Sequence, residues 1–317
     1  MAVKRKPCLV VLIPALNEEK TIGSVIRAIP RNIAGLGKAL VLVVDDGSID
    51  RTVQKSRLAK ADKIVSHGVN EGLGIAFKTG IENALEMGAD IIVNIDADGQ
   101  FNPGDIKKII EPILSGKADV VTCSRFKRKA FEPKMPFVKR LGNKLFTKMI
   151  NLFTKSSFTD TQCGFRAYSR EAALRLNLFA KFTYTQETLI DLINNGMRIE
   201  EVACKVRGQR EGQSRVVKSW YGYGAKALTI VVRTLRDYKP MLFFGGLGAI
   251  LFLAGVIGVL YYWIFSPLPT PGWIVYGIGL LIMLGFLLMI LALIADMLDR
   301  QRRIQEEILY RLRKKNL

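Results

Sequence analysis

The stretch IIVNIDADGQ, residues 91–100, decides the fold because an apolar run passes directly into acidic and amide side chains. Similar apolar runs lie elsewhere in the first 125 residues: CLVVLI at 8–13, LVLVVDD at 40–46 and DVVTCS at 119–124. Between them, segments 19–29, 51–61, 72–87 and 104–115 carry apolar residues at a spacing of three to four. Buried strands that alternate with amphipathic helices predict an α/β fold with a doubly wound, mostly parallel sheet.

Polar motifs follow these predicted strands at their carboxyl ends. Asn17-Glu18 comes after the first run, Asp45-Asp46-Gly47-Ser48 ends the second, and Asp96-Ala97-Asp98 ends the run at 91–98. In open parallel sheets, ligands bind in the crevice beyond the carboxyl ends of the strands. We therefore expect these motifs to line a single ligand site.

The pattern Asp96-x-Asp98-x-Gln100 is the candidate metal site. Side chains two residues apart in an extended backbone point the same way. Two carboxylates with an amide oxygen form a hard oxygen set that suits Mg²⁺ or Mn²⁺, which substrate phosphates typically complete. A buried structural pair of aspartates is the alternative, and the chain also has the cations that such a pair would need.

Two further loops have the residue types of a nucleotide pocket. A carboxylate of Asp45-Asp46-Gly47-Ser48 can accept hydrogen bonds from a base or a ribose, whereas Asp50 can simply cap the next helix. The loop Asn70-Glu71-Gly72-Leu73-Gly74 opens a helix and can approach a ligand through its backbone. Phe77 stands where a dinucleotide-binding loop has its third glycine, which disfavours a nicotinamide cofactor.

Charge is unevenly distributed along the 317 residues. The formal net charge is +19, yet no charged residue lies between Lys239 and Asp296. Within that window, 241–265 and 273–295 are each long enough for a membrane-spanning helix of ~20 residues. Membrane and phosphate ligands therefore explain the charge better than nucleic acid does. The basic residues on both outer flanks predict that the catalytic domain and both termini of this multi-pass protein are cytoplasmic.

Two basic amphipathic segments precede the predicted spans, one at 138–153 and one from Trp220 to Tyr238. Such helices suit a bilayer interface, although a solvated charged face is the alternative. The tail from Asp299 is expected to be a helix at the lipid surface or against another subunit. The predicted domains are a catalytic domain at 1–215 with an interfacial helix at about 136–153, a juxtamembrane helix at 216–240, a transmembrane hairpin at 241–295 and a basic cytoplasmic tail helix at 296–317.

The cysteines and the single histidine suggest no further chemistry. Cys8, Cys123, Cys163 and Cys204 lack metal-ligand spacing, and three of them lie in or beside apolar runs. We expect reduced thiols in the core, as in a cytoplasmic domain. His67 is expected at a strand end, as a surface or turn residue.

Taken together, the motifs resemble the family-2 glycosyltransferases of the GT-A fold, in particular the polyprenyl-phosphate group that includes dolichol-phosphate mannose synthases and bacterial polyprenyl-phosphate glucosyltransferases. The resemblance is distributed over roughly residues 8–220. It rests on Pro14-Ala15-Leu16-Asn17-Glu18, Asp45-Asp46-Gly47-Ser48, Asn70-x-Gly72-x-Gly74, Asp96-Ala97-Asp98-Gly99-Gln100, Ser124-Arg125-Phe126, Asp160-Thr161-Gln162-Cys163-Gly164-Phe165-Arg166, Gln186-Glu187 and Gly212-Gln213-Ser214-Arg215.

The resemblance implies a role for each matching residue. The nucleotide-sugar would bind at Pro14, Leu16, Asn17, Glu18, Asp45, Asp46, Asn70, Gly72, Asp96, Ala97 and Asp98, and the metal at Asp96, Asp98 and Gln100. Arg125 would contact the sugar diphosphate or the acceptor phosphate, while Arg210 and Arg215 would close on the phosphates. The family usually has lysine where Arg215 stands, and its preceding arginine is shifted here, so Arg207 and Arg210 are both eligible. Lys134 and Arg140 are candidates for the acceptor phosphate by their position.

We expect inverting transfer of a hexose from a UDP- or GDP-linked donor to a polyprenyl phosphate, with a homo-oligomer implied by the relatives. A phosphate monoester is largely dianionic at neutral pH, since its second pKa is ~6, so it needs no strong base. Asp160 would orient the acceptor, act as a weak base or fix the turn before Tyr168. The alternatives are a hydroxyl lipid or polysaccharide acceptor, for which Asp160 or Glu187 would have to act as a base, and a non-catalytic membrane adaptor.

Overall fold

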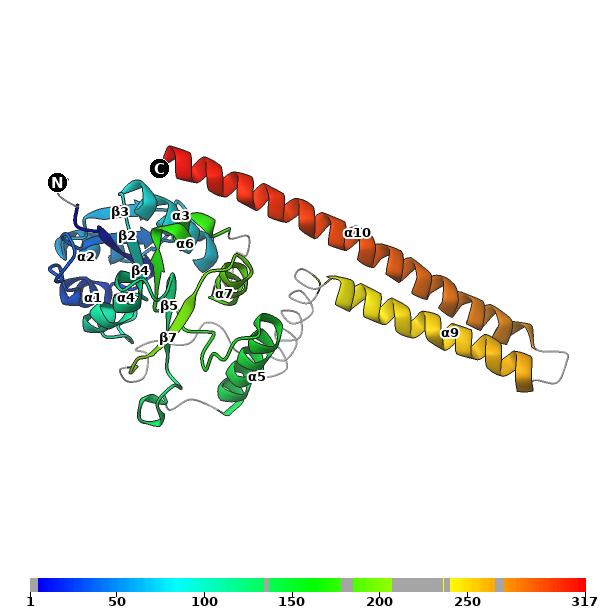
Figure 1. The fold of residues 1–317 in the computed structure, drawn as a ribbon. Helices are drawn as coiled ribbons and strands as arrows, with labels where there is room; N and C mark the ends of the chain where they lie inside the picture. Colours follow the sequence, from blue (N-terminus) through cyan, green and yellow to red (C-terminus); the bar gives the residue numbers. More distant parts are fainter. Residues whose placement is uncertain (1–4, 134–136, 178–184, 207–235, 237–239, 266–270) are drawn as a thin grey trace. The chain divides into compact units, whose positions relative to one another are not determined.

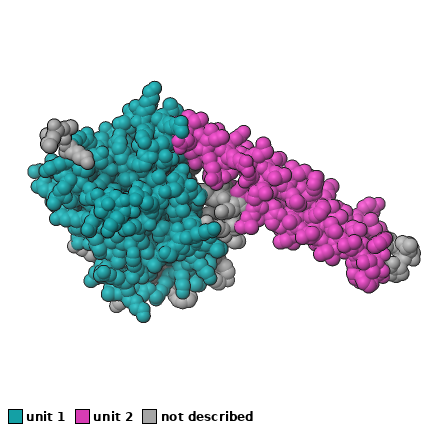
Figure 2. All heavy atoms as spheres, in the orientation of Figure 1, with its two compact units in different colours: residues 1–216, 310–317 teal, residues 217–309 magenta. Residues whose placement is uncertain are grey.

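The computed structural model describes two compact units, which Figure 2 colours separately. One unit comprises Met1–Val216 together with Tyr310–Leu317, and the other comprises Val217–Leu309. The described residues are 5–133, 137–177, 185–206, 236, 240–265 and 271–317.

A twisted sheet forms the centre of the first unit (Figure 1). In its described part the strands are β1 (Leu9–Ala15), β2 (Leu40–Asp45), β3 (Lys63–Ser66), β4 (Ile91–Asn94), β5 (Val120–Ser124), β6 (Arg166–Ser169) and β7 (Ile199–Ala203). Their order across the sheet is β3-β2-β1-β4-β6-β5-β7. Only β6 of these strands runs antiparallel to its neighbours β4 and β5. The predicted mostly parallel, doubly wound sheet is therefore confirmed.

Helices cover both faces of this sheet, which explains why its strands are apolar on both sides. On β1, Val11 and Ile13 face a core shared with α1 (Ile22–Ala28), α4 (Ile106–Leu114) and Ala59, which follows α2 (Thr52–Leu58), whereas Val10 and Leu12 face a second core. The second core is built with α3 (Leu73–Glu86), α6 (Arg170–Arg175) and α7 (Thr185–Asn194). Alternate side chains of a strand point to opposite faces, so β1 is buried throughout.

The order of the strands creates a switch point at β1. The chain passes from β1 to β2 and β3 on one side and then returns to β4 on the other side of β1. The loops that follow β1 and β4 therefore diverge and leave a crevice at the carboxyl edge. Pro14 lies in β1, and the segments 16–18 and 95–100 follow β1 and β4 directly.

Helix α5 (Phe137–Thr154) packs against the rest of the first unit through a face that contains both polar and apolar side chains. Asn143, Phe146, Thr147 and Ile150 are buried. An apolar stripe lies elsewhere on the helix, where Leu141, Leu145 and Leu152 are exposed by 54%, 58% and 76%. This stripe makes no packing contact that would bury it within the described chain.

The second unit is built from long apolar helices. After one π-helical turn, η3 (Met241–Gly245), α9 spans Gly246–Phe265, and α10 runs without a break over Gly272–Asn316. The two backbones touch, because a Cβ on Gly248 would lie 2.8 Å from the carbonyl oxygen of Gly285 and one on Gly285 would lie 2.5 Å from the amide of Phe252. Small residues allow this close approach between apolar helices. The second predicted span and the tail helix are thus parts of one helix.

The last eight residues of the chain pack on α6 of the first unit, rather than at a lipid surface or against another subunit as expected for the tail. Tyr310 is only 7% exposed, and its hydroxyl donates to Glu171 of α6 at 2.5 Å. Arg313 donates to the carbonyl of Leu176 at 2.9 Å, where α6 has just ended. A cation that binds the free carbonyls after a helix is a favourable cap.

The prediction of four reduced cysteines is wrong for one pair. Cys123 of β5 and Cys204, which follows β7, form a disulfide with an S–S distance of 2.14 Å, while Cys8 and Cys163 are free thiols. The two residues are 81 positions apart in sequence, but parallel pairing of β5 and β7 brings their Cα atoms to 5.6 Å. Cysteine usage therefore no longer supports a reducing compartment.

Candidate active site

The loops after β1 and β2 hold each other in place at the crevice. The amide of Asn17 donates to Ser48 Oγ at 2.8 Å, and the side-chain oxygen of Asn17 accepts from the amide of Ile49 at 2.9 Å. The amide of Glu18 donates to Thr52 Oγ1 at 2.8 Å. Asn17 has a φ of 52°, a conformation that asparagine tolerates better than most residues. Asn17 thus helps to fix the shape of the loops at this edge of the sheet.

Asp46 organises the third loop of this wall. Its carboxylate is 4% exposed and accepts hydrogen bonds from the amides of Glu71 at 3.0 Å and Gly72 at 2.9 Å, and it lies 2.9 Å from His67 Nδ1. The histidine expected at a surface or turn is instead largely enclosed, because its other ring nitrogen contacts Thr79. The carboxylate therefore fixes the backbone at Asn70–Gly72 beside the crevice.

Asp45 and Asp50 have structural partners as well. Asp45 is 2% exposed and accepts from Ser66 Oγ at 2.6 Å, which ties β2 to β3. Asp50 accepts from the amide of Thr52 at 2.9 Å, at the start of α2, as expected of a capping residue. These two carboxylates explain how the loop after β2 keeps its shape.

The candidate metal loop follows β4 as a turn rather than as extended backbone. β4 ends at Asn94, and Gly99 has a φ of 71° in the turn that contains Asp98. Asp96 and Asp98 are both partly exposed and flank Ala97, which is buried. Buried Ala97 fixes the loop to the core and leaves both aspartates at the open edge of the sheet.

The oxygen atoms of Asp96, Asp98 and Gln100 suit a hard divalent cation, but they are too few to fill its coordination shell. The backbone amide of Gln100 donates to Asp98 Oδ1 at 3.0 Å, which ties Gln100 to the turn that contains Asp98. Within the part of the chain that the structure describes, no group of three or more His, Cys, Asp or Glu side chains could hold a metal. A cation at Asp96 and Asp98 would therefore complete its shell with water or substrate oxygens, as Mg²⁺ commonly does.

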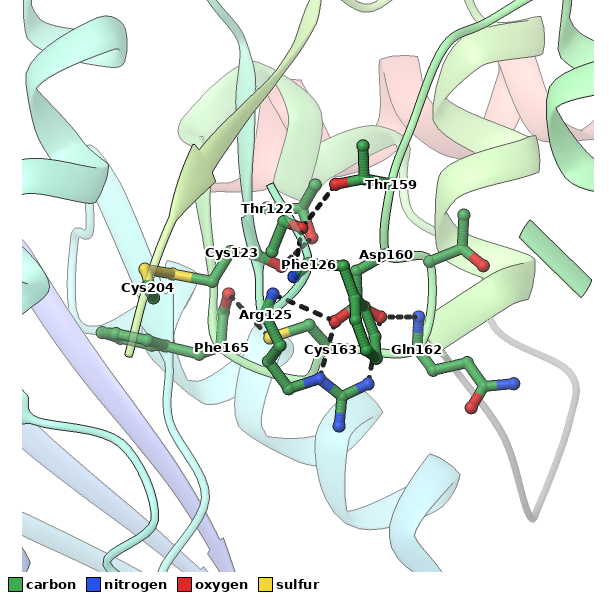
Figure 3. A network of polar contacts seen from close by, with 12 residues as sticks. Thr122, Cys123, Arg125, Phe126, Thr159, Asp160, Gln162, Cys163, Phe165 and Cys204 are labelled. Carbon is green, nitrogen blue, oxygen red and sulfur yellow. Dashed lines mark hydrogen bonds and ion pairs between the residues drawn. A yellow bond between two sulfur atoms is a disulfide. The ribbon is translucent and has the colours of Figure 1, made fainter. Parts of the chain in front are cut away.

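Arg125 and Asp160 form a two-point ion pair (Figure 3). Arg125 Nε lies 2.6 Å from Asp160 Oδ2, and Nη2 lies 3.0 Å from Oδ1. The Asp160 side chain is 0% exposed and also accepts from the amides of Arg125 and Gln162, whereas the Arg125 side chain is 21% exposed. This geometry gives Asp160 a structural role that the sequence did not suggest, which is to hold Arg125, and its predicted roles stay predictions.

The charge of Arg125 is secured by its surroundings. Burial lowers the pKa of its guanidinium, but the hydrogen bonds and the negative charge of Asp160 outweigh that effect and raise the pKa. The negative charge of Asp96 raises it further. β4 and β5 run parallel to each other, because each pairs antiparallel with β6, so the candidate metal loop and Arg125 both follow their strands at the same edge of the sheet.

One predicted residue has an acidic partner, and others lie outside the described residues. Arg140 is exposed and pairs with the carboxylate of Glu132. Outside the described residues are Lys134, Arg207, Arg210 and Arg215, as are the side chains of Gln186 and Glu187. The predicted phosphate clamp therefore stays a prediction.

The structure also adds side chains that no motif suggested. Glu201 of β7 accepts from the amides of Thr159 and Asp160, each at 2.9 Å, and from Thr159 Oγ1 at 2.7 Å. Ser124 Oγ lies 2.5 Å from Thr159 Oγ1. The sequence signal was weak, because β7 contains two adjacent glutamates, Glu200 and Glu201, and only the strand's pairing decides which one faces inward.

Comparisons with known proteins agree with this geometry. Residues 10–176 match a family model described as glycosyl transferase family 2. The chain is 35% identical over 213 residues to the UDP-N-acetylglucosamine–dolichyl-phosphate N-acetylglucosaminyltransferase of Methanococcus voltae, covering 61% of this chain and 83% of that one. It is 29% identical over 219 residues to the polyprenol monophosphomannose synthase of Mycolicibacterium smegmatis, covering 65% and 80%.

A solved structure shares the fold. The glucosyl-3-phosphoglycerate synthase of Mycobacterium tuberculosis, in complex with Mn²⁺, UDP-glucose and glycerol 3-phosphate, matches with a TM-score of 0.56 and 25% identity over 72% of this chain and 79% of that one. The GT-A type of fold expected from the motifs is thereby confirmed.

Proposed function

The chain belongs to the family-2 glycosyltransferases, and we propose that it transfers a hexose from a UDP- or GDP-linked sugar to a polyprenyl phosphate, dolichyl or undecaprenyl, at the cytoplasmic face of a membrane. One observation carries the proposal: Asp96 and Asp98 follow β4 and Arg125 follows β5, and these two parallel strands end at the same edge of the sheet. The two relatives described above are named for transfer to dolichyl phosphate and for polyprenol monophosphomannose synthesis.

The donor nucleotide is assigned to the wall built by the first two strands and by the start of α3. Asn17, Asp46 and Gly72 set the shape of this wall through their mutual contacts. Pro14, Leu16, Glu18, Asp45, Asn70 and Ala97 complete the proposed set. Rigid loops of this kind favour binding because little conformational freedom is lost when the ligand arrives.

Asp96 and Asp98, with Gln100, are the proposed ligands of Mg²⁺ or Mn²⁺, an ion that the M. tuberculosis relative binds together with UDP-glucose. When bound, a divalent cation supplies positive charge that stabilises the departing diphosphate. Arg125 supplies a second, permanent positive charge, and burial against Asp160 keeps it oriented.

The proposed reaction is a single displacement. A phosphate oxygen of the lipid forms a bond to the anomeric carbon while the bond from that carbon to the diphosphate breaks and its electron pair leaves with the nucleoside diphosphate. The configuration is inverted. No proton has to be removed from a phosphate dianion, which agrees with the use of Asp160 as a partner of Arg125. Arg210 and Arg215 are the proposed phosphate clamp, and Lys134, Arg140 and Arg215 the proposed contacts of the acceptor phosphate.

The membrane anchor is assigned to the second unit. In each of the helices Met241–Phe265 and Gly272–Asn316, only 11% of the most apolar window is buried, unlike the core helix of a soluble protein. The exposed leucines of α5 lie beside exposed Lys144 and Lys148, a composition that suits the bilayer interface.

The fold of the C-terminal residues supports the proposal that both ends of the hairpin lie on the same side of the membrane. Residues 310–317, which comprise the last turns of α10 and Leu317, belong to the same unit as the sheet. A return to the same side requires an even number of membrane crossings between the two ends. The excess of lysine and arginine at these ends favours the cytoplasmic side. A homo-oligomer stays part of the proposal.

A transfer assay with two acceptors tests the function. The purified full-length chain in detergent is incubated with Mn²⁺, a panel of radiolabelled UDP- and GDP-sugars, and either a polyprenyl phosphate or the corresponding free polyprenol. We expect one donor to label the polyprenyl phosphate, giving an acid-labile sugar phosphodiester, with no label on the polyprenol. Label on the polyprenol would instead support a hydroxyl acceptor, and no transfer from any donor would support a non-catalytic adaptor.

A further inference from the structure

A chain of hydroxyl groups leads from the turn that carries Arg125 to the neighbouring strand. Ser124 Oγ accepts hydrogen bonds from the amides of Phe126 and Lys127, each at 3.1 Å. The same oxygen lies 2.5 Å from Thr159 Oγ1, which in turn donates to Glu201 Oε2 at 2.7 Å. The chain therefore links the backbone on the carboxyl side of Arg125 to a carboxylate on β7.

The hydrogen bonds in this chain have a fixed direction. A hydroxyl group has a single proton and two lone pairs. The proton of Thr159 goes to Glu201, so the proton of Ser124 must go to Thr159. The two lone pairs of Ser124 Oγ are then used by the two amides. All donors and acceptors in this row of hydrogen bonds are paired only when position 201 provides an acceptor without a proton, such as a carboxylate.

A second branch runs from the same carboxylate to Arg125. Glu201 Oε1 accepts from the amides of Thr159 and Asp160, each at 2.9 Å. The carboxylate of Asp160 in turn accepts hydrogen bonds from Nε, Nη2 and the backbone amide of Arg125. Glu201 thus holds two turns. The turn at 159–160 orients the guanidinium of Arg125, and the turn at 124–127 contains Arg125 itself.

We propose that Glu201 is a positioning residue for the transfer reaction, acting through Thr159 and Asp160 to hold Arg125 against the leaving diphosphate. The inference rests on the proposed function, because it takes Arg125 as the cation that stabilises that group. Asp160 occupies Nε and Nη2, while Nη1 of Arg125 has no hydrogen-bond partner within the described residues. The guanidinium is thus tied along one edge and open to a ligand on the other.

The substitution Glu201→Gln tests the direction of these hydrogen bonds without creating a cavity. Its amide has the size of the carboxylate, but one of its two ends is a donor. Placed against either the hydroxyl of Thr159 or the amides of Thr159 and Asp160, that end meets another donor. The matched control is Glu200→Gln, since Glu200 is the adjacent residue of β7, is exposed, and points to the opposite face of the strand.

A double-mutant cycle separates positioning from a general structural effect. In the full-length chain, Glu201→Gln is expected to lower kcat about tenfold, the effect typical of second-layer partners of a functional group, while the KM for the donor changes less than about twofold. Glu200→Gln is expected to leave both unchanged. In an Arg125→Ala background, Glu201→Gln should have no further effect, because the two substitutions act on one unit. An unchanged kcat in Glu201→Gln, or a full tenfold loss in the Arg125→Ala background, would overturn the proposal.

A spectroscopic readout decides the same question without turnover. The Nε–H resonance of Arg125 is assigned by its loss in Arg125→Lys, and its exchange with water is compared between variants of the purified chain. We expect faster exchange and a changed shift in Glu201→Gln and neither change in Glu200→Gln. The same spectrum in both variants would overturn the proposal. If the wild-type chain shows no transfer at all, the proposed function fails, and this readout still decides whether Glu201 positions Arg125.

Discussion

The two halves of the sheet hold their functional loops in different ways. On the side of β1, β2 and β4, neighbouring loops brace one another directly, as Asn17 does with Ser48 and Asp46 with Gly72. On the side of β5 and β7, Arg125 depends on Asp160, which depends on Glu201, and the Cys123–Cys204 disulfide joins the same two strands. Substitutions in the first half should therefore act locally, whereas those in the second half should reach the site through intermediates.

The largest effect is expected at the metal loop of the first half. Asp98→Ala should reduce kcat/KM at least about 10³-fold, because stabilisation of charge on a leaving group is usually the largest single contribution to catalysis. The unfolding temperature should hardly change, since Asp98 is partly exposed. Steady-state kinetics with Mn²⁺ and a melting curve measure the two quantities. Asp105→Ala, at the end of the following 3₁₀ turn (Pro103–Asp105), is the control. Normal transfer by Asp98→Ala would show that the metal loop is misassigned.

A second substitution tests whether the loops of the first half brace one another. Gly47 has a φ of 76°, and a Cβ there would lie 2.6 Å from the carbonyl carbon of Val69. Gly47→Ala should destabilise the fold by about 3 kcal/mol, since it combines a backbone clash with backbone strain. Gly35 has a φ of 82° with open space around it, so Gly35→Ala should cost only about 1 kcal/mol. Chemical denaturation compares them, and equal losses would mean that the loops do not pack as described.

The disulfide provides the corresponding test in the second half. Cys204→Ser should lower the free energy of unfolding by about 2 kcal/mol, because the bond closes a long loop in the unfolded chain. Transfer should fall as well, since the bond links β5, which Arg125 follows directly, to the end of β7, which contains Glu201. Cys8→Ser, at a free thiol, is the matched control for both measurements. If thiol titration of the denatured protein finds four free cysteines, the bond does not form.

These two halves also differ in how much the sequence reveals. The runs at 8–13, 40–46, 91–98 and 119–124 correspond to β1, β2, β4 and β5, because strands buried on both faces are apolar throughout. The motifs after β1, β2 and β4 were found for the same reason. By contrast, β3, β6 and β7 have four or five residues each and mixed composition, so periodicity did not reveal them.

Contacts that need the order of the strands could not be predicted. Cys123 and Cys204 meet only because β7 pairs with β5, and Glu201 reaches Thr159 for the same reason. The docking of Tyr310 on α6 is another case, since a basic amphipathic tail has the same pattern whether it contacts lipid or protein. Periodicity is a local property, whereas these contacts join residues 40 to 140 positions apart.

The smallest expected effect concerns that C-terminal contact and its dependence on pH. Burial raises the pKa of Glu171, but hydrogen bonds from Tyr310, Lys314 and Arg175 and the charge of Lys314 outweigh it, so the pKa is lowered in the folded chain. A lowered carboxyl pKa contributes stability above the unfolded pKa, and this contribution is lost as pH falls through the folded pKa. Hydrogen exchange of residues 310–317 should therefore accelerate below roughly pH 4, relative to the sheet.

Glu171→Gln provides the control for that experiment. With no titrating group at the contact, exchange at residues 310–317 should be faster at neutral pH and should change less between pH 6 and pH 4 than in the wild-type chain. The same acid response in both proteins would assign the effect to other groups. Either result leaves the catalytic loops untouched, because α6 lies at the opposite end of β6 from Asp160.

The identity of the bond formed tests the central claim most directly. A donor labelled with ¹³C at the anomeric carbon is incubated with the full-length chain, Mn²⁺ and a polyprenyl phosphate, and the lipid product is examined by ¹³C and ³¹P NMR. The account predicts that the labelled carbon couples to a single lipid phosphorus and has the anomeric configuration opposite to that of the donor. A labelled carbon without phosphorus coupling, or with the configuration of the donor retained, would contradict direct displacement by the lipid phosphate.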